Sequence, residues 1–395
     1  MDNKYADRLK MMENKELGDL MRIIGRDDLI SFAGGIPSKD IFPVKELNQI
    51  TEKIMTEKPK EFYQYSSTEG NNPLRDYLAE FLNQRGLDTA GKNIIITTGS
   101  QQALDLVAKL FINPNDKVVV EQPGYGGGIG AFKSYQANIK GIPVEKDGIN
   151  VDLLEKYLSE LKQKNEYIKF LYLVPDYSNP SGARLSLAKR KKILALAGEY
   201  DFKIIEDTPY SELNYFDERI DYIKKYDSEN RVILLGTFSK FFVPGLRVAW
   251  VCSNPEFINL LSQAKQNTDL ASATPGQLIL YQAGISGLLD KQIKRIAPFY
   301  RERLEAMGQA LDKYFPETAD WFQPKGGFFF WVKLPSGMNS RKLLDQAIEK
   351  KVAFVTGSSF FVQAEEGYRY MRLSFSDSVP EDIDKGIKIL SDLIS

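Results

Sequence analysis

Short apolar runs alternate with amphipathic segments along most of the chain from residue 93 onward. In residues 101–111, for example, Leu104, Val107 and Leu110 recur at the spacing of one face of a helix. Continuous apolar runs are typical of strands buried on both faces, so this alternation predicts a mainly parallel sheet between helices. The expected strands are residues 94–96, 118–120, 170–174, 202–205, 232–235 and 248–251, and a helix is expected over 187–200.

The pattern changes after these strands, because residues 255–314 are dominated by helical periodicity. A mixed region follows, with strands expected at 327–332, 352–355 and 371–375 and a helix from Ser340. This change predicts two domains. The large one is expected over residues 46–300, and a smaller α+β domain over residues 301–395 together with the N-terminal segment 1–45, whose first 26 residues are expected to be helical.

Composition excludes several classes of function for this chain of 395 residues. The net charge is -1, from 52 basic and 53 acidic residues, so no basic excess favours nucleic acid or an anionic membrane. No run of 18 apolar residues is present and the N-terminus lacks the apolar core of a signal peptide, so we expect a cytoplasmic protein without a membrane span. The single cysteine, Cys252, lies in an apolar run and is expected to fill the core.

The chain contains no histidine. This absence excludes Ser-His-Asp and Cys-His catalysis, histidine proton shuttles and the usual zinc sites. An enzymatic base must therefore be a lysine, aspartate, glutamate or tyrosine.

Ligands of open α/β sheets bind at the carboxyl ends of the strands, so the residues that follow the apolar runs are candidates for a binding site. Ser100 follows one run at the start of a helix, where it either binds a phosphate or only caps the helix. Tyr125 follows the next run, where it either lies against a planar ring or covers the sheet edge. The glycine-rich segment 126–130 lacks the spacing of a dinucleotide-binding loop and is expected to be a flexible turn.

Three later strands end in further polar residues. Asn179 lies in a turn cluster, from which its amide could donate to a ring oxygen. Asp207 and the residue before it end a buried strand, and burial of a carboxylate without a partner costs free energy. Asp207 therefore either holds a protonated pyridine nitrogen or caps the strand. Tyr210, three residues later, can reach the same face. Lys240 is flanked by aromatic residues and close to Arg247, so burial and repulsion should lower the pKa of its amine and free it to form an imine.

These residues form motifs that resemble those of class I/II aminotransferases of PLP fold type I over nearly the whole chain. The motifs are Gly99-Ser100-Gln101, Asn179-Pro180-x-Gly182, Asp207-x-x-Tyr210 and Thr237-x-Ser239-Lys240-(x)6-Arg247. Residues 31–37, 63–65 and 370–375 resemble the branch with aminoadipate, kynurenine and aromatic aminotransferases. The resemblance implies an α/β fold in which a large domain has a mainly parallel seven-stranded sheet between helices, beside a smaller α+β domain.

The resemblance also implies a role for each site residue. Lys240 would hold pyridoxal 5'-phosphate as a Schiff base and shuttle a proton, and Asp207 would keep the pyridine nitrogen protonated. Arg372 would bind the substrate α-carboxylate with its two-pronged guanidinium, and Gly35 would leave room for the substrate. The phosphate would be bound by Ser100, Gln101, Thr237, Ser239 and Arg247. Tyr125 would lie on the ring, Asn179 and Tyr210 would bind the phenolic oxygen, and Asn179 would also lie near the substrate. Tyr65 would reach the cofactor from a second subunit, in a homodimer with shared active sites.

The implied function is transfer of an amino group from an aromatic or aliphatic L-amino acid to a 2-oxo acid by a ping-pong mechanism. A lyase or decarboxylase of the same fold is the alternative, since its cofactor contacts would hardly differ. A regulatory protein of this fold would need an N-terminal DNA-binding module, and only 30 residues precede Ser31. Gly18 stands where relatives that prefer acidic substrates carry an arginine, which favours neutral substrates, although Arg22 and Arg26 lie nearby.

The chain departs from the family pattern at three positions. Ser178 and Ser181 replace the usual glutamine and threonine on either side of Asn179-Pro180, and Ala249 replaces a glycine after Arg247. None of these three residues is expected to take part in the chemistry.

Overall fold

The computed structural model describes residues 5–6, 8–12, 26, 28–216 and 221–394. Within the expected N-terminal helix only α1, Leu9–Met12, is described, and the rest of that expectation lies outside the described residues. The other α-helices are α3 Val44–Glu57, α4 Pro59–Tyr63, α5 Asn72–Asn83, α6 Ser100–Phe111, α7 Gly126–Ser134, α8 Val151–Gln163, α9 Leu187–Glu199, α10 Pro255–Gln266, α11 Thr274–Ile285, α12 Leu288–Tyr314, α13 Ser340–Glu349 and α14 Pro380–Ile394.

The largest sheet is mixed and mostly parallel, with the strand order β2-β9-β8-β7-β6-β3-β4-β5. Strands β4, β3, β6, β7 and β8 run parallel to one another, while β9 is antiparallel to both β8 and β2 and β5 is antiparallel to β4. The sheet has eight strands, one more than the seven expected, because the two-residue strand β5 pairs with β4. Its strands are β2 Ile94–Thr97, β3 Lys117–Gln122, β4 Asn138–Glu145, β5 Gly148–Ile149, β6 Phe170–Leu173, β7 Lys203–Asp207, β8 Val232–Thr237 and β9 Ala249–Cys252.

Helices cover both faces of this sheet, and neighbouring residues of one strand bury on opposite sides. In β3, Val118 and Val120 belong to the hydrophobic cluster that includes residues of α6 and α7, whereas Val119 belongs to the cluster that includes residues of α8 and α9. Burial on both faces explains why the strands are continuous apolar runs, and all six expected strands are present. Cys252 of β9 is fully buried, as expected for a residue of the core.

The expected strand at 352–355 is divided into β11, Val352–Ala353, and β12, Val355–Thr356, which belong to different sheets. Other elements also differ from the sequence expectation. Strand β4 was not predicted, because it lies near the edge of the sheet and most of its residues are exposed or half-buried, which leaves no apolar run. The expected turn at 126–130 is wrong, since α7 begins there. The helix forms because Ile129 and Phe132 are buried against the core, and the glycines allow close approach to neighbouring side chains.

A smaller group of strands lies beside the large sheet. Strand β13, Tyr370–Ser374, pairs antiparallel with β10, Phe329–Lys333, and with β12, Val355–Thr356. Strand β1, Ile30–Ser31, pairs parallel with β11, Val352–Ala353, so the segment around β1 lies beside the C-terminal region of the chain.

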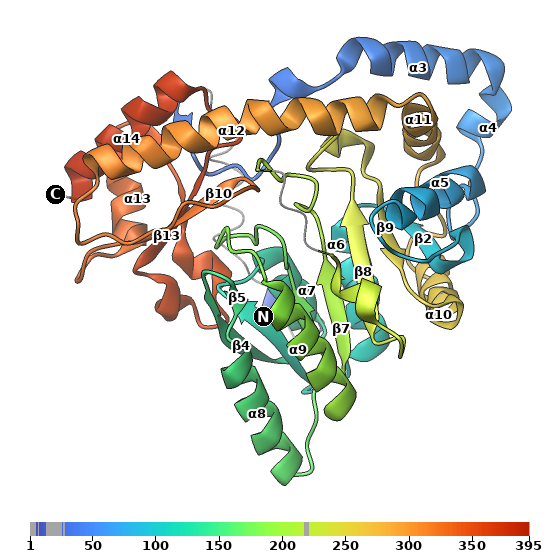
Figure 1. Cartoon of the computed structure of the whole chain (residues 1–395), viewed down its shortest axis with the longest axis horizontal. Coiled ribbons are helices and arrows are strands. Elements are labelled where there is room, and N and C mark those ends of the chain that lie inside the picture. Colours follow the sequence, from blue (N-terminus) through green and yellow to red (C-terminus); the bar gives the residue numbers. More distant parts are fainter. Residues whose placement is uncertain (1–4, 7, 13–25, 27, 217–220, 395) are drawn as a thin grey trace.

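The long helix α12 connects the two regions and packs against α14 (Figure 1). It crosses residue 300 without a break, so the expected boundary at that residue falls inside a helix, and the division into 46–300 and the remainder stays a prediction.

Short 3-10 helices occur at η1 Lys39–Ile41, η2 Gly91–Asn93, η3 Ile223–Tyr226, η4 Pro244–Leu246, η5 Gly357–Phe360 and η6 Ala364–Gly367.

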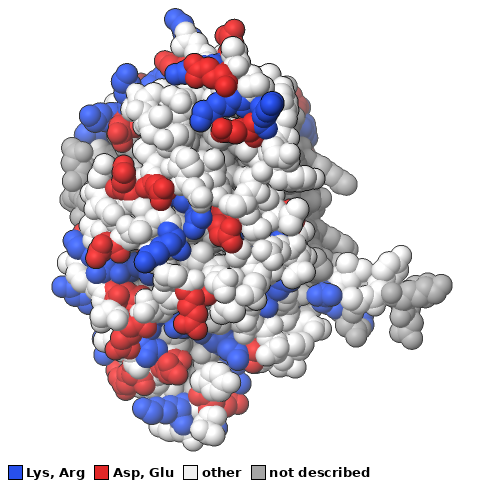
Figure 2. Space-filling model, turned by 90° about the vertical axis from the view of Figure 1, so that its right-hand side faces the viewer, with Lys and Arg blue, Asp and Glu red and all other residues white. Residues whose placement is uncertain are grey.

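The surface carries both signs of charge. Figure 2 shows basic and acidic side chains interspersed over the visible face, as the nearly balanced composition would produce. Among the described residues, no helix combines the length and the apolar character that crossing a membrane requires.

Candidate active site

A cavity of about 250 Å³ lies where the carboxyl ends of the sheet strands meet β13 and the segment before η1. All the predicted site residues except Tyr65 line it. The lining consists of Ala33, Gly35, Ser100, Gln101, Tyr125, Val174, Asn179, Asp207, Pro209, Tyr210, Thr237, Ser239, Lys240, Arg247 and Arg372.

Lys240 lies in the turn after β8, where its Nζ donates a hydrogen bond to the carbonyl oxygen of Gly35 at 2.8 Å. The pKa of this amine is lowered to about 8, mainly because protein surrounds it and also because the guanidinium groups of Arg372 and Arg247 repel its charge. The carboxylate of Asp207 acts in the opposite direction. The predicted effect of burial and Arg247 is present, and Arg372 adds to it, so a larger fraction of the amine is neutral at a given pH than for an exposed lysine.

Asp207 ends β7 with its side chain toward the cavity and is almost fully buried. Its Oδ2 accepts a hydrogen bond from Tyr172 Oη at 2.9 Å, while its Oδ1 has no partner among the described residues. Burial raises the pKa of the carboxyl to about 7, and the Tyr172 hydrogen bond and the charge of Lys240 oppose that rise. A buried carboxylate oxygen that faces a cavity without a donor is suited to a cationic N–H group.

The N-terminus of α6 offers hydrogen-bond donors and positive charge, in contrast to the acceptor oxygen of Asp207. Gly99, which precedes the helix, has a φ of 76°, and a Cβ there would lie 2.4 Å from Nη2 of Arg247. The glycine therefore lets the guanidinium approach the first turn closely. Ser100 Oγ is buried there without a partner among the described residues. A helix N-terminus beside a guanidinium and a free hydroxyl is suited to a phosphate.

The turn after β8 adds hydroxyl groups on the same side. Thr237 Oγ1 donates to Ser239 Oγ at 3.0 Å, and the backbone N–H of Ser239 donates to Thr237 Oγ1 at 3.2 Å. Tyr125 and Gln101 approach each other, with 3.4 Å between the phenolic oxygen and Oε1. These contacts orient the hydroxyl groups that line this end of the cavity.

Arg372 comes from β13 and is buried beside the cavity. Its Nη1 donates to Asn179 Oδ1 at 2.8 Å and its Nη2 to the carbonyl oxygen of Ala33, and its guanidinium lies 4.3 Å from the ring centre of Phe329. Burial lowers the pKa to about 10, so the group remains charged at neutral pH. Nε has no partner among the described residues, which leaves a donor for an anion.

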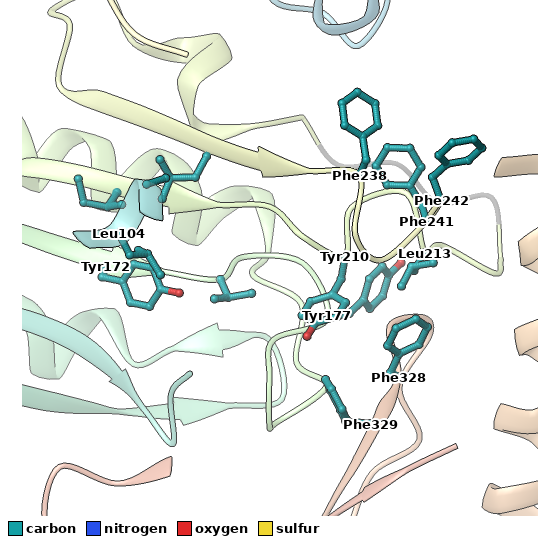
Figure 3. Close-up of a cluster of buried hydrophobic side chains, with 14 of the residues drawn as sticks. Leu104, Tyr172, Tyr177, Tyr210, Leu213, Phe238, Phe241, Phe242, Phe328 and Phe329 are labelled. Atoms are coloured by element: carbon teal, nitrogen blue, oxygen red, sulfur yellow. The ribbon is translucent and has the colours of Figure 1, made fainter. Parts of the chain in front are cut away.

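Aromatic packing supports this part of the wall. Tyr210 is buried and lies edge-on to Phe328 and Phe329, with ring centres 5.9 Å and 5.7 Å away. Figure 3 shows these three side chains in one cluster of buried residues. Burial also raises the pKa of the Tyr210 phenol, so its hydroxyl keeps its proton and can donate. Two of the residues that depart from the family pattern have contacts within the protein: Ser178 Oγ donates to the buried Glu121, and Ala249 pairs with Thr237 in the sheet.

Tyr65 is not brought to the cavity within one chain. It follows α4 and is 79% exposed, so its predicted contact would have to reach the cavity of another copy. Gly18 and Arg22, the positions used to infer substrate charge, lie outside the described residues.

Sequence reasoning missed Tyr172, which holds Asp207. A usable signal was present, because a tyrosine inside a continuous apolar strand must find a partner for its hydroxyl when it is buried.

Comparison with known proteins identifies the family. Residues 27–390 match the model of aminotransferase class I and II, so the chain belongs to this family. It is 40% identical to the aromatic-amino-acid aminotransferase 1 of Thermococcus litoralis over 391 residues, which are 99% of this chain and 94% of that protein. It is 36% identical to the 2-aminoadipate transaminase of Thermus thermophilus, with 98% of this chain and 94% of that protein covered.

A solved structure agrees with this assignment. The kynurenine aminotransferase of Pyrococcus horikoshii, in complex with PMP, KYN as substrates and KYA as products, has a TM-score of 0.95 and 39% identity to this chain. The match covers 100% of this chain and 97% of that one. The protein is therefore an aminotransferase of PLP fold type I, and the family uses pyridoxal phosphate.

The cavity fits this cofactor by its unpartnered buried atoms. Ser100 Oγ, beside a helix N-terminus and Arg247, suits the phosphate, and Asp207 Oδ1 suits a protonated ring nitrogen. Lys240 supplies an amine with a lowered pKa, and Arg372 Nε remains for a carboxylate. Each chemical end of the cofactor and its substrate therefore has a matching group in one cavity.

Proposed function

We propose that this aminotransferase moves the amino group of an aromatic or aliphatic L-amino acid to a 2-oxo acid by a ping-pong reaction in this cavity. The observation that carries the proposal is the joint placement of Lys240, Asp207 and Arg372 around one space, with an amine of lowered pKa between an acceptor for a cation and a donor for an anion. Transamination needs all three groups, because the substrate must be held by its carboxylate while its Cα loses a proton.

When bound, pyridoxal phosphate supplies an electron-withdrawing ring that stabilises negative charge on the substrate Cα. Lys240 would hold the cofactor through Nζ, and its amine would take up and return the proton that the substrate Cα loses. The lowered pKa suits this role, because a neutral amine can accept the proton.

Asp207 keeps the ring nitrogen protonated by presenting Oδ1 to it. Ser100, Gln101, Thr237, Ser239 and Arg247 bind the phosphate and so orient the ring. Tyr125 would pack against the ring, while Asn179 and Tyr210 would bind the phenolic oxygen. The raised pKa of Tyr210 supports its part, since a protonated hydroxyl can donate to an anionic oxygen.

Arg372 binds the α-carboxylate of both substrates, with Asn179 beside it and Gly35 leaving room for the substrate. A Cβ at Gly35 would lie 2.9 Å from the Phe329 ring and 3.7 Å from Arg372 Nη1, so a larger residue there would narrow the space before the guanidinium. The aromatic rings of Phe329 and Phe360 pack against the guanidinium and hold it beside the cavity.

The active form is a homodimer in which Tyr65 completes the phosphate site of the other subunit. The high exposure of Tyr65, together with exposed Tyr63 and Met55 on the same region, supports this arrangement. Mixing Lys240→Ala and Tyr65→Phe chains would test it, because hybrid dimers contain either one intact site or none, depending on whether Tyr65 acts across the interface.

The decisive experiment supplies the PLP-loaded protein with one amino acid at a time and follows the absorbance of the bound cofactor and the products. Transamination must convert the bound cofactor to pyridoxamine phosphate with one equivalent of 2-oxo acid. Carbon dioxide or a β-eliminated product without pyridoxamine phosphate would instead indicate the decarboxylase or lyase alternative.

Lys240→Ala should lower turnover by at least about 10⁴-fold and abolish covalent attachment of the cofactor on borohydride reduction. Arg369→Lys, a change outside the cavity, serves as the control for handling and folding. Normal transamination by Lys240→Ala would disprove the assignment.

A further inference from the structure

The hydrogen bond between Tyr172 and Asp207 is built into the centre of the sheet. Tyr172 lies in β6 and is 2% exposed, and its register partner in the parallel strand β7 is Ile205. Asp207 lies two residues beyond Ile205 and therefore points to the same face of the sheet as Tyr172. This placement brings the phenolic Oη to 2.9 Å from Asp207 Oδ2.

Helix α7 closes over the tyrosine at a position that has no side chain. A Cβ at Gly128 would lie 2.9 Å from Cε1 of Tyr172, 3.1 Å from Cζ and 3.3 Å from Oη. One turn later, Phe132 packs edge-on against the same ring, with 5.4 Å between ring centres. Gly128 and Phe132 thus confine the ring to the orientation in which its hydroxyl reaches Asp207.

The bond occupies one carboxylate oxygen and leaves the other to face the cavity. Burial raises the pKa of the Tyr172 phenol well above 10, so Tyr172 keeps its proton and acts as a donor. The other titratable groups that act on the Asp207 carboxyl or are acted on by it are Lys240, Tyr125 and Tyr210. Tyr172, and none of these three groups, makes the side-chain hydrogen bond that favours the charged form of Asp207.

We propose that Tyr172 is a positioning residue that keeps the proton on the cofactor ring nitrogen and not on Asp207. A donor on Oδ2 makes the carboxylate a weaker base, so a proton shared between Oδ1 and the ring nitrogen remains on the nitrogen. The ring then withdraws electrons most strongly. This inference rests on the proposed function, because it assigns Asp207 to the ring nitrogen.

The first test compares Tyr172→Phe with Tyr215→Phe. Tyr215 is a matched control, since it is also buried and donates one hydrogen bond, to the carbonyl oxygen of Gly327, outside the cavity. Carbon-13 NMR of labelled aspartate in the PLP-free protein, assigned with Asp207→Asn, measures the carboxyl pKa. Tyr172→Phe should raise it by about one unit or more, and Tyr215→Phe should not.

The second readout is the nitrogen-15 shift of labelled cofactor in the loaded protein. In Tyr172→Phe this shift should move toward the value of an unprotonated pyridine, and kcat should fall about tenfold to a hundredfold with little change in KM. If the carboxyl pKa and the nitrogen shift of Tyr172→Phe equal those of Tyr215→Phe, the inference is wrong, even when the wild-type protein transaminates as proposed.

A second pair of variants keeps the tyrosine and moves it. Gly128→Ala should displace the ring and reproduce both changes, whereas Gly130→Ala, in the same helix with nothing within 4 Å of the added Cβ, should reproduce neither. This pair decides the matter if Tyr172→Phe does not fold. Equal carboxyl pKa values and nitrogen shifts in Gly128→Ala and Gly130→Ala would overturn the proposal. A wild-type protein that does not transaminate would instead refute the proposed function.

Discussion

The two faces of strand β7 carry one buried carboxylate each, Glu206 and Asp207, and they differ in the hydrogen-bond donors that surround it. On the closed face, Glu206 accepts hydrogen bonds from the backbone N–H groups of Ile223 at 2.7 Å and Lys224 at 3.0 Å, and Arg190 lies 3.9 Å away. On the cavity face, Asp207 accepts one hydrogen bond, from Tyr172, and its other oxygen has no partner in the part of the chain that the structure describes. Both side chains are buried and both carboxyl pKa values are raised to about 7 by burial.

Burial and a raised pKa therefore do not separate a structural carboxylate from a functional one. The difference lies in which oxygens have donors and in what the remaining oxygen faces. Glu206 begins a closed network, since the fully buried Arg190 also pairs with Asp176 at 2.6 Å. Asp207 leaves its network incomplete toward the cavity, which is the arrangement expected for a residue that binds a ligand.

The largest effect that would sharpen this comparison is expected from Asp207→Ala. Turnover should fall by about 10³-fold, because the electron-withdrawing power of the ring depends on its protonated nitrogen. The free energy of unfolding of the PLP-free protein should change less than in Glu206→Ala, because removal of a buried carboxyl with a raised pKa offsets the loss of the Tyr172 hydrogen bond. Steady-state kinetics and urea denaturation measure the two quantities, and activity within tenfold of wild type would contradict the assignment.

Glu206→Ala should show the opposite pattern. Removing the acceptor leaves two backbone N–H groups and part of the Arg190 charge without a partner, so the free energy of unfolding should fall by about 3 kcal/mol. Under conditions where the variant is folded, kcat should remain within a few-fold of wild type. Loss of activity in the folded variant would break the proposed difference between the faces.

A smaller effect is expected for Arg372→Lys at the far side of the cavity. Lysine keeps the charge but loses the fork geometry, so KM for the amino donor should rise about tenfold to a hundredfold while kcat changes less. Arg369→Lys is the matched control, because Arg369 is a neighbour in sequence that bonds the carbonyl oxygen of Leu334 and does not line the cavity. Equal KM values in both variants would argue against carboxylate binding by Arg372.

The smallest effect is a dependence of stability on pH. Both carboxyl pKa values are raised in the folded PLP-free protein, so the folded state binds more protons than the unfolded state between about pH 4 and pH 7. The stability contributed by these groups is therefore present at low pH and lost as pH rises to 7, with at most about 1.4 kcal/mol per pH unit from each group. Asp207→Asn and Glu206→Gln should each reduce this slope in urea titrations, although only the first should reduce activity; an unchanged slope in both variants would contradict the pKa shifts.

Much of the large domain could be predicted from the pattern of apolar residues. Strands buried on both faces are mostly apolar, because a buried polar side chain needs a partner, and so they appear as nearly uninterrupted apolar runs such as 170–174 and 232–235. Strand β4 escaped detection because its position near the sheet edge exposes most of its residues. Helix α7 escaped it because three consecutive glycines are typical of a turn, and only the packing of Ile129 and Phe132 against the core favours a helix there.

The site could be predicted to a similar degree and for a related reason. Polar residues directly after buried strands have few roles other than ligand binding or capping, which drew attention to Asp207 and Lys240. The resemblance to a known family then added Arg372, which lies far from them in sequence. Tyr65 is exposed and does not line the cavity of its own chain, so its predicted contact depends on the packing of two chains, which local sequence patterns do not encode.

The amino-acid sequence by itself determined the chemistry available to this protein: a chain without histidine, a lysine among aromatic residues, and acids at the ends of apolar strands. Only the tertiary structure decided which acid faces the cavity. A strand buried on both sides has no polar and apolar alternation to mark its faces, so the distinction between Glu206 and Asp207 comes from the elements packed against each face. The contact of Tyr172 with Asp207 has the same origin, because it depends on strand register and on the closeness of α7.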